Sequence, residues 1–148
     1  MTEVEEFRLS DLIKRMDREF DSSFLSQEKD RRAAYAIGAY LNSGMYYQRT
    51  KLKTRGLLKK MRYLLDNLDR AKLLKVFAEV SQVLVAVSYV DDSRSLGNPF
   101  RERAEALLTD AEWNSSSEEL FFAFMMGFDL FSREWGKKTE ETTDEQDK

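Results

Sequence analysis

Hydrophobic residues recur along the chain at the three- and four-residue spacing of amphipathic helices. A first stripe runs from Phe7 to Phe20, and the serines at 22–23 predict a break after it. A second helix is predicted from Ser26 to about Gln48. Gly38 and Gly44 lie within it, and each lowers helix propensity by about 1 kcal/mol relative to Ala. We therefore expect these glycines to allow close approach of a neighbouring helix.

The same spacing predicts further helices in the middle of the chain. A third covers about residues 55–68, and a fourth covers about residues 69–89. The apolar run at 83–87 also resembles a strand, but a lone strand would have no partner in this sequence, so a helix is favoured. This run is also far shorter than the roughly 20 apolar residues that cross a bilayer, so no membrane span is predicted.

Capping residues predict the starts of the last two helices. A loop is predicted at 91–99, and its last two residues, Asn98-Pro99, fit an N-cap followed by the first helical position of a fifth helix. Ser116 and Glu119 match the capping box of a sixth. The sixth helix carries an aromatic and methionine stripe, which at helical spacing we interpret as core or subunit interface.

Composition supports an all-α fold. The chain has 148 residues, of which 42% are apolar and 34% charged, with one proline and six glycines. This is the composition of a globular protein rich in helix formers. We predict a single compact bundle of about five to six helices over residues 1–136. Residues 137–148 are polar and acidic, and we expect a disordered tail there.

The missing residue types exclude much of enzyme chemistry. The chain has no histidine and no cysteine, which removes imidazole bases, thiolate nucleophiles, Cys/His zinc sites and disulfides. The acid pairs 91–92 and 118–119 remain, but adjacent residues point in different directions on a helix. We expect no enzyme activity, no metal and no cofactor. The acidic N-terminus does not resemble a signal peptide, which favours a cytoplasmic protein.

The charge is distributed very unevenly along the chain. The formal net charge is −3, yet residues 31–65 hold nine basic residues and no acid. These cations are Arg31, Arg32, Arg49, Lys51, Lys53, Arg55, Lys59, Lys60 and Arg62. One interpretation is a solvated face that acids elsewhere in the fold neutralise. The other is a strip that binds a polyanion, because phosphate binding needs several cations along one surface.

The geometry of the strip depends on where the third helix begins. If the chain is helical from Lys51, then Lys51, Arg55, Lys59 and Arg62 fall within about 80° of one another and form one ridge. If Gly56 delays the helix, Arg49 to Arg55 form a basic loop instead. The main candidate binding residues are Arg49, Lys51, Lys53, Arg55, Lys59, Lys60 and Arg62.

Tyrosines accompany these cations. Tyr35, Tyr46, Tyr47 and Tyr63 all lie within residues 31–65, and aromatic rings beside cations can stack on the bases of single strands. Tyrosines of a helical bundle more often bury the ring and leave the hydroxyl in water. Additional candidate binding residues are Arg31, Arg32, Tyr46, Tyr47 and Gln48.

Three segments resemble a known family. They are the Ala/Gly helix that ends in Tyr47-Gln48 before the basic stretch, the run from Gly56 to Leu68 that leads into a Phe/Val helix, and the Phe/Met helix at 121–128. Together they resemble the C-terminal helical region of the large subunit of type I-B CRISPR surveillance complexes, which is also made separately as the Cascade small subunit. The resemblance spans about residues 28–136.

This resemblance implies a non-catalytic helical subunit that assembles in several copies along a complex guided by crRNA. Its partners would be further copies of itself, the large and backbone subunits, and the opened target DNA, especially the displaced non-target strand. Of the family's basic surface, only the cations at 49–62 are matched here. The alternative is a protein-interaction or scaffold subunit that makes no direct contact with nucleic acid.

Overall fold

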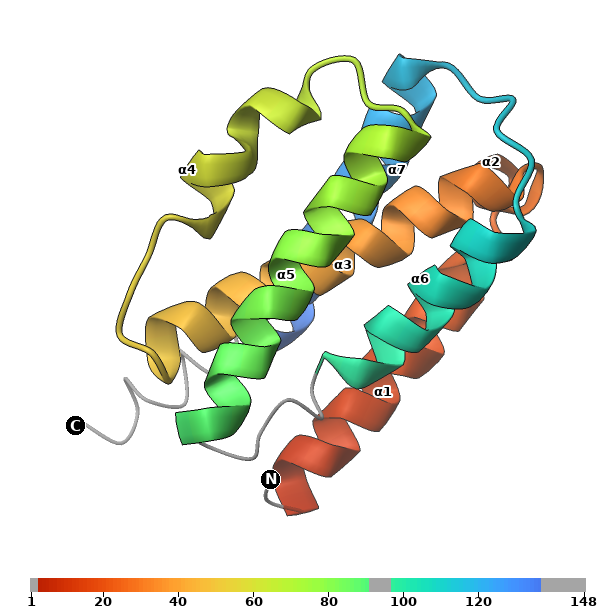
Figure 1. The fold of residues 1–148 in the computed structure, drawn as a ribbon. Coiled ribbons are helices and arrows are strands. Elements are labelled where there is room, and N and C mark those ends of the chain that lie inside the picture. Colours follow the sequence, from red (N-terminus) through yellow and green to blue (C-terminus); the bar gives the residue numbers. More distant parts are fainter. Residues whose placement is uncertain (1–2, 91–96, 137–148) are drawn as a thin grey trace.

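One central helix organises the molecule. The computed structural model describes residues 3–90 and 97–136, and within them every regular element is helical. The central helix, α3 (Lys29–Thr50), has other helices packed around it (Figure 1). Every residue from Ala33 to Gly44 is buried, so this part of α3 is enclosed on all faces. A helix that is apolar or small-sided all round its axis is suited to such a position.

Four longer helices surround α3. In the view of Figure 1, α5 (Arg70–Val90) crosses in front of it and α7 (Ser117–Phe131) lies behind. On the other side, α6 (Asn98–Asp110) lies beside α1 (Glu3–Glu19). Short elements complete the described chain. They are α2 (Ser23–Ser26), α4 (Leu57–Met61), the 3₁₀ turn η1 (Arg62–Leu65) and the π-helical turn η3 (Ser132–Gly136).

The closest helix contact joins α3 to α7 through two glycines. A Cβ atom on Gly38 would lie 2.0 Å from the carbonyl oxygen of Phe124, and one on Gly127 would lie 1.9 Å from that of Tyr35. The two backbones therefore touch reciprocally, each glycine facing a carbonyl of the other helix. The prediction that Gly38 serves close helix packing is confirmed, and Gly127 makes the matching contact.

Gly44 allows a second close approach, this time to α5. Its Cβ would lie 2.8 Å from Cγ1 of Val80. Near this contact the Tyr40 hydroxyl lies 2.9 Å from the Ser81 hydroxyl, and the Tyr40 ring packs at 5.3 Å from that of Phe77. The prediction for Gly44 is therefore confirmed as well, and α3 is fixed to α5 by both apolar and polar contacts.

Tyr35 fixes α1 against the same core. Its ring is fully buried and meets Phe20 edge-on at 5.4 Å, while its hydroxyl donates to Glu19 at 2.5 Å. Burial raises the pKa of Tyr35, and the hydrogen bond to Glu19 raises it further. The hydroxyl therefore stays protonated at any physiological pH and acts as a hydrogen-bond donor.

The all-α prediction is confirmed over the described residues, and most of the predicted helix starts agree with it. The capping box is present: the Ser116 side chain accepts from the Glu119 N–H, and the Glu119 carboxylate accepts from the Ser116 N–H. The N-cap predicted at Asn98 is wrong by one position. Asn98 is the first helical residue, and Gly97 is the N-cap. Residues 83–87 are helical within α5. The loop expected at 91–99 lies largely outside the described residues, and the tail expected at 137–148 lies wholly outside them.

The third predicted helix is much shorter than expected. A helix was predicted over residues 55–68, but α4 and η1 together cover only Leu57 to Leu65. Gly56 adopts a φ of +118°, and Asn67 adopts +52°. These left-handed conformations cannot belong to a right-handed helix, so they end the element on both sides.

Substituting Gly127 with Ala tests the contact between α3 and α7. We expect the variant to lose at least about 2 kcal/mol of unfolding free energy, because the new methyl group would displace the Tyr35 carbonyl from a packed backbone contact. Denaturant-induced unfolding followed by circular dichroism measures this loss. The control is Ala78→Val on the exposed face of α5, which should cost less than about 1 kcal/mol. Equal unfolding midpoints for the two variants would contradict the close contact.

Candidate nucleic-acid interface

The basic stretch begins where α3 ends and the chain turns back over its end. The Lys51 N–H bonds to the Tyr47 carbonyl at 2.8 Å, and the Thr54 N–H bonds to the Gln48 carbonyl at 3.1 Å. The Gln48 side chain then accepts from the Leu57 N–H at 3.1 Å. Gln48 therefore joins the last turn of α3 to the first residue of α4 and sets the distance between the two helices.

The alternative geometries of the basic strip are now resolved. Residues 51–56 form a turn and an extended loop, so the prediction of a single helical ridge from Lys51 is wrong. The physical reason lies in the backbone, because Lys53 adopts a φ of +56° and Gly56 one of +118°. The basic loop that was expected over Arg49 to Arg55 is confirmed from Lys51 onward, whereas Arg49 still lies in the last turn of α3.

Four of the predicted binding residues line one open groove. Arg49, Arg55, Lys59 and Arg62 surround a groove of about 690 Å³ beside the C-terminal end of α3 and the start of α4. We call it the basic groove. Its other lining residues are Met45, Gln48, Thr54, Gly56, Leu57 and Leu58. The described residues that line it therefore include no acid.

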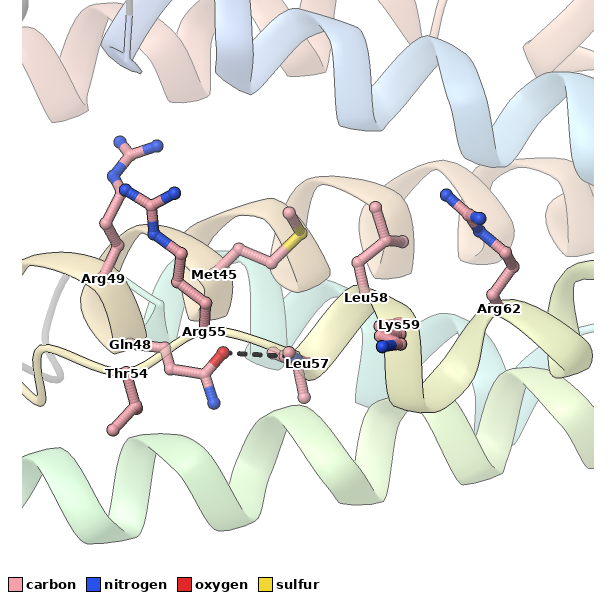
Figure 2. Close-up of a pocket in the computed structure, with 10 residues that line it drawn as sticks. Met45, Gln48, Arg49, Thr54, Arg55, Leu57, Leu58, Lys59 and Arg62 are labelled. Atoms are coloured by element: carbon pink, nitrogen blue, oxygen red, sulfur yellow. Dashed lines mark hydrogen bonds between the residues drawn. The ribbon is translucent and has the colours of Figure 1, made fainter.

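Figure 2 shows how the side chains are arranged in the basic groove. In this view the guanidinium groups of Arg49 and Arg55 lie at one end of the groove, and that of Arg62 lies at the other. Met45 and Leu58 lie between them and extend toward the same side. The groove therefore has positive charge at both ends and an apolar floor in the middle.

The cations of the basic groove are available to solvent. Arg49, Arg55, Lys59 and Arg62 are all exposed. In the part of the chain that the structure describes, Arg55, Lys59 and Arg62 make no ion pair. The Arg49 guanidinium lies 6.0 Å from the centre of the Tyr46 ring, which holds it near the rim. Among the described residues, no carboxylate therefore neutralises Arg55, Lys59 or Arg62.

The other three main candidates lie outside the groove. Lys51 and Lys53 are exposed on the loop. Lys60 points to α5, where its ammonium group lies 2.9 Å from the Glu79 carboxylate. Lys51 and Lys53 therefore add positive charge around the groove without lining it, whereas the charge of Lys60 is paired with Glu79.

Arg31 and Arg32 lie at the opposite end of α3. With a rise of 1.5 Å per residue, about 27 Å of helix separates Arg31 from Arg49. Arg31 is buried and Arg32 is half-buried. The expectation that they extend the basic strip is therefore wrong, because the length of the central helix holds the two groups apart.

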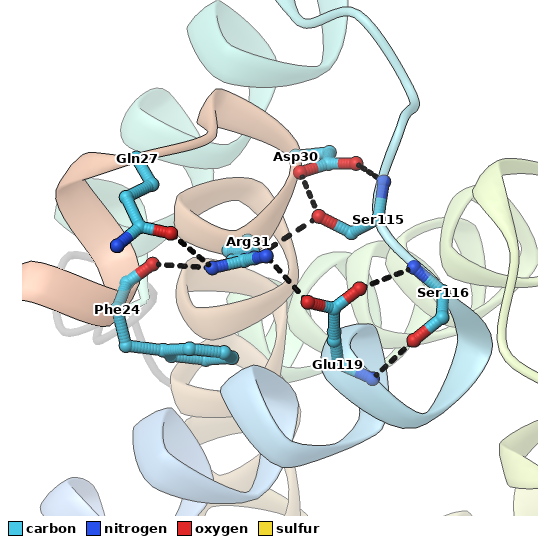
Figure 3. Close-up of polar contacts among 7 residues, drawn as sticks. All are labelled: Phe24, Gln27, Asp30, Arg31, Ser115, Ser116 and Glu119. Atoms are coloured by element: carbon cyan, nitrogen blue, oxygen red, sulfur yellow. Dashed lines mark hydrogen bonds and ion pairs between the residues drawn. The ribbon is translucent and has the colours of Figure 1, made fainter.

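Arg31 instead joins a polar network inside the fold (Figure 3). Its guanidinium group donates to the Glu119 carboxylate at 2.5 Å, to the Ser115 hydroxyl at 3.1 Å and to the Phe24 carbonyl at 3.0 Å. The fully buried Asp30 carboxylate accepts from both the N–H and the hydroxyl of Ser115 at 2.8 Å. This network fixes the start of α3 to the segment that leads into α7.

Glu119 has two roles in this network. It closes the capping box with Ser116 and also receives the Arg31 ion pair. The hydrogen bonds from Ser116 and the nearby Arg31 charge lower the pKa of the Glu119 carboxyl. The carboxylate is therefore ionised at neutral pH and matches the positive charge of Arg31.

Only one of the four tyrosines is well placed for stacking on a base. Tyr35 and Tyr47 are buried in the core. Tyr46 is half-buried and packs edge-on against Trp135 and Phe131, at 6.3 Å from each ring. Tyr63 is 69% exposed and follows Arg62 directly in η1. The tyrosines therefore belong mainly to the core, as is usual in helical bundles.

Sequence reasoning missed the apolar floor of the groove. The spacing of apolar residues predicted helices around Met45 and Leu58 but gave neither side chain a place on an exposed surface. Both are half-buried and pack against the core with part of their surface. No sequence signal distinguishes such residues from fully buried ones, because the difference depends on where the loop between α3 and α4 lies.

A second surface groove is apolar. It has a volume of about 390 Å³ and lies between the turn before α5 and the start of α7. Phe121, Phe122 and Met125 line it and are 41%, 58% and 39% exposed. The α7 stripe thus contributes both to the core, as predicted, and to an exposed apolar surface. We call this surface the α7 groove.

Comparisons with known proteins identify no relative. No family model, curated protein or solved structure matches the chain. Among residues 3–90 and 97–136, no helix is both long and apolar enough to span a bilayer. The same residues contain no group of three or more histidine, cysteine or acidic side chains placed to hold a metal ion.

Replacing Arg31 with Ala should separate structural charge from surface charge. The variant leaves the buried Asp30–Ser115 pair and Glu119 without their cationic partner, and we expect a loss of about 2–4 kcal/mol of unfolding free energy. Chemical denaturation measures it. Lys59→Ala, which removes an exposed cation of the groove, is the control and should change stability by less than about 0.5 kcal/mol. An equally small effect for Arg31→Ala would contradict the role of the network.

Proposed function

We propose that this chain is a non-catalytic subunit that binds the phosphates of a single-stranded nucleic acid in its basic groove. The observation that carries the proposal is the groove itself. Four exposed cations line it and no described acid does, although the chain as a whole has a net charge of −3. A concentration of exposed cations on one surface of an anionic protein favours a polyanionic ligand.

The chemistry of the groove supports binding without sequence readout. Arginine guanidinium groups bind phosphate oxygens through paired hydrogen bonds, and three of the four groove cations are arginines. Contacts to phosphates hold a strand in place but carry no sequence information. A groove of this kind suits a protein that holds a single strand while base pairing at another site reads the sequence.

The family resemblance supports a more specific setting for this activity. We propose that the chain is the small subunit of a type I CRISPR surveillance complex in the cytoplasm and holds the displaced strand of the target DNA. About four phosphate contacts give one copy only weak affinity at physiological salt. Several copies in a row would raise the affinity through effective concentration, with no new contact required.

One observation favours a second function. The α7 groove exposes Phe121, Phe122 and Met125 next to one another, and contiguous exposed apolar surface often marks a protein interface. In this alternative, the chain is a scaffold subunit that docks through apolar contacts and makes no contact with nucleic acid. Direct measurements of binding to a single strand distinguish the two functions.

Removal of three groove cations tests the proposed binding. The triple variant Arg55→Ala, Lys59→Ala, Arg62→Ala should bind a single strand at least about 10-fold more weakly at low salt. The slope of log affinity against log salt should fall in magnitude from about −3 to about −1, because each lost phosphate contact removes about 0.7. Fluorescence anisotropy of a labelled oligonucleotide measures both quantities.

A charge-matched control accompanies this variant. Lys14→Ala, Arg18→Ala, Lys75→Ala removes three exposed cations that lie outside the groove and leaves the same net charge. We expect this control to retain nearly the wild-type affinity and salt slope. Equal losses in the two triple variants would reject the groove and indicate an effect of overall charge alone.

Co-purification tests the proposed assembly. If the chain is a Cascade subunit, it should co-purify from its native host with a guide RNA and with larger sibling subunits. The groove variant should still assemble, while the complex that contains it should hold target DNA less tightly. Recovery without any RNA, together with unchanged DNA affinity of the variant complex, would favour the scaffold alternative.

A further inference from the structure

The apolar floor of the basic groove is not explained by phosphate binding. Met45 from α3 and Leu58 from α4 lie between the Arg49–Arg55 pair and Arg62, and all five side chains extend toward the same side (Figure 2). Phosphate oxygens are strongly hydrated and gain nothing from contact with methyl and methylene groups. A ligand that fits this groove therefore carries an apolar surface between two anionic groups.

A nucleotide chain has this pattern when its bases are unpaired. Successive phosphates are separated by a sugar and a base, and the flat faces of the base are the least polar surface of the strand. In a duplex these faces are stacked and cannot reach a groove floor, whereas in a single strand they are accessible. The order of cation, apolar floor and cation thus matches the order of phosphate, base and phosphate.

The size of the groove is also more than a phosphate contact needs. Its volume of about 690 Å³ lies in the range of pockets that enclose small organic ligands. The guanidinium planes of Arg49 and Arg55 at one end offer a second surface on which a base can stack. The Tyr46 ring, itself packed against Trp135, holds Arg49 at that end.

We infer that the basic groove is a base-binding subsite, in which one unpaired nucleobase rests on Met45 and Leu58 while the cations at either end contact the flanking phosphates. The inference rests on the proposed function and adds to it a specific ligand class. The groove recognises a base-bearing single strand and discriminates against both duplexes and bare polyphosphates. The two floor residues, Met45 and Leu58, carry no hydrogen-bonding group, so the floor contacts the face of a base and not its edge.

The experiment compares two oligonucleotides that differ only in their bases. One is an oligothymidylate of about 12 nucleotides, and the other has the same backbone with every base replaced by an abasic site. Affinities of the full chain are measured by fluorescence anisotropy at about 50 mM salt, where phosphate contacts are still strong. We expect the wild-type protein to bind the oligothymidylate at least about 5-fold more tightly than the abasic strand.

A variant of the groove floor assigns the difference to the subsite. Leu58→Gln should bring the affinity for oligothymidylate down to that for the abasic strand and leave the latter unchanged. The unchanged abasic affinity also reports that the variant is folded. Leu74→Gln is the matched control, because Leu74 is a 40% exposed leucine of α5 that does not line the groove. This control should keep the wild-type preference.

The possible outcomes separate the two proposals. Equal binding of both strands by the wild-type protein would overturn the base-binding subsite and leave phosphate binding intact. A preference that persists unchanged in Leu58→Gln would also overturn it, since the base would then bind elsewhere. If the wild-type protein binds both strands no better than the triple groove variant does, the proposed function fails and the subsite fails with it.

Discussion

The fold depends on the direct contact between the backbones of α3 and α7. Gly38 and Gly127 each face a carbonyl group of the other helix at a distance that leaves no room for a side chain. This contact brings the two backbones together, and other helices cover the rest of α3, so that every residue from Ala33 to Gly44 is buried. The polar groups in this enclosed part make their hydrogen bonds inside the bundle, as Tyr35 does with Glu19 and Tyr40 with Ser81. The exposed side chains of α3 therefore lie near its two ends.

The two ends of α3 treat positive charge in opposite ways. At the start of the helix, Arg31 is buried and its charge is matched by Glu119, with Asp30 nearby in the same network. At the other end, the chain leaves the helix and places its cations around an open groove whose described lining includes no acid. Arginine thus belongs to a buried polar network at one end and to an exposed groove at the other. Net charge along the sequence does not distinguish these roles, because it contains no information on burial.

Local sequence signals predicted the elements whose cause is local. The capping box at Ser116 and Glu119 is a contact within one turn, so its residues alone define it. Gly38 was recognised because a glycine inside a helix needs a packing reason, although its partner Gly127 could not be paired with it from sequence. Gly56 correctly pointed to a basic loop. These features depend on intrinsic conformational preferences, which the order of residues encodes directly.

Features that depend on tertiary contacts were not predictable in the same way. The third helix was expected to continue to residue 68, but the chain turns at Asn67 so that Leu68 can be buried. From the sequence, Arg31 was expected to belong to a basic strip. It is instead a buried partner of Ser115 and Glu119, because the segment before α7 packs against the start of α3. The apolar floor of the groove depends likewise on where the loop crosses the end of α3.

The two walls of the basic groove belong to elements that differ in length and in how deeply they are enclosed by the fold. Met45 and Arg49 are carried by the most enclosed helix, whereas Leu58, Lys59 and Arg62 are carried by a short peripheral element. Short elements with few packed neighbours open in local fluctuations well below the free energy of global unfolding. The hydrogen bond from the Leu57 N–H to the Gln48 side chain crosses this boundary. A local opening of α4 would therefore change the width of the groove without unfolding α3.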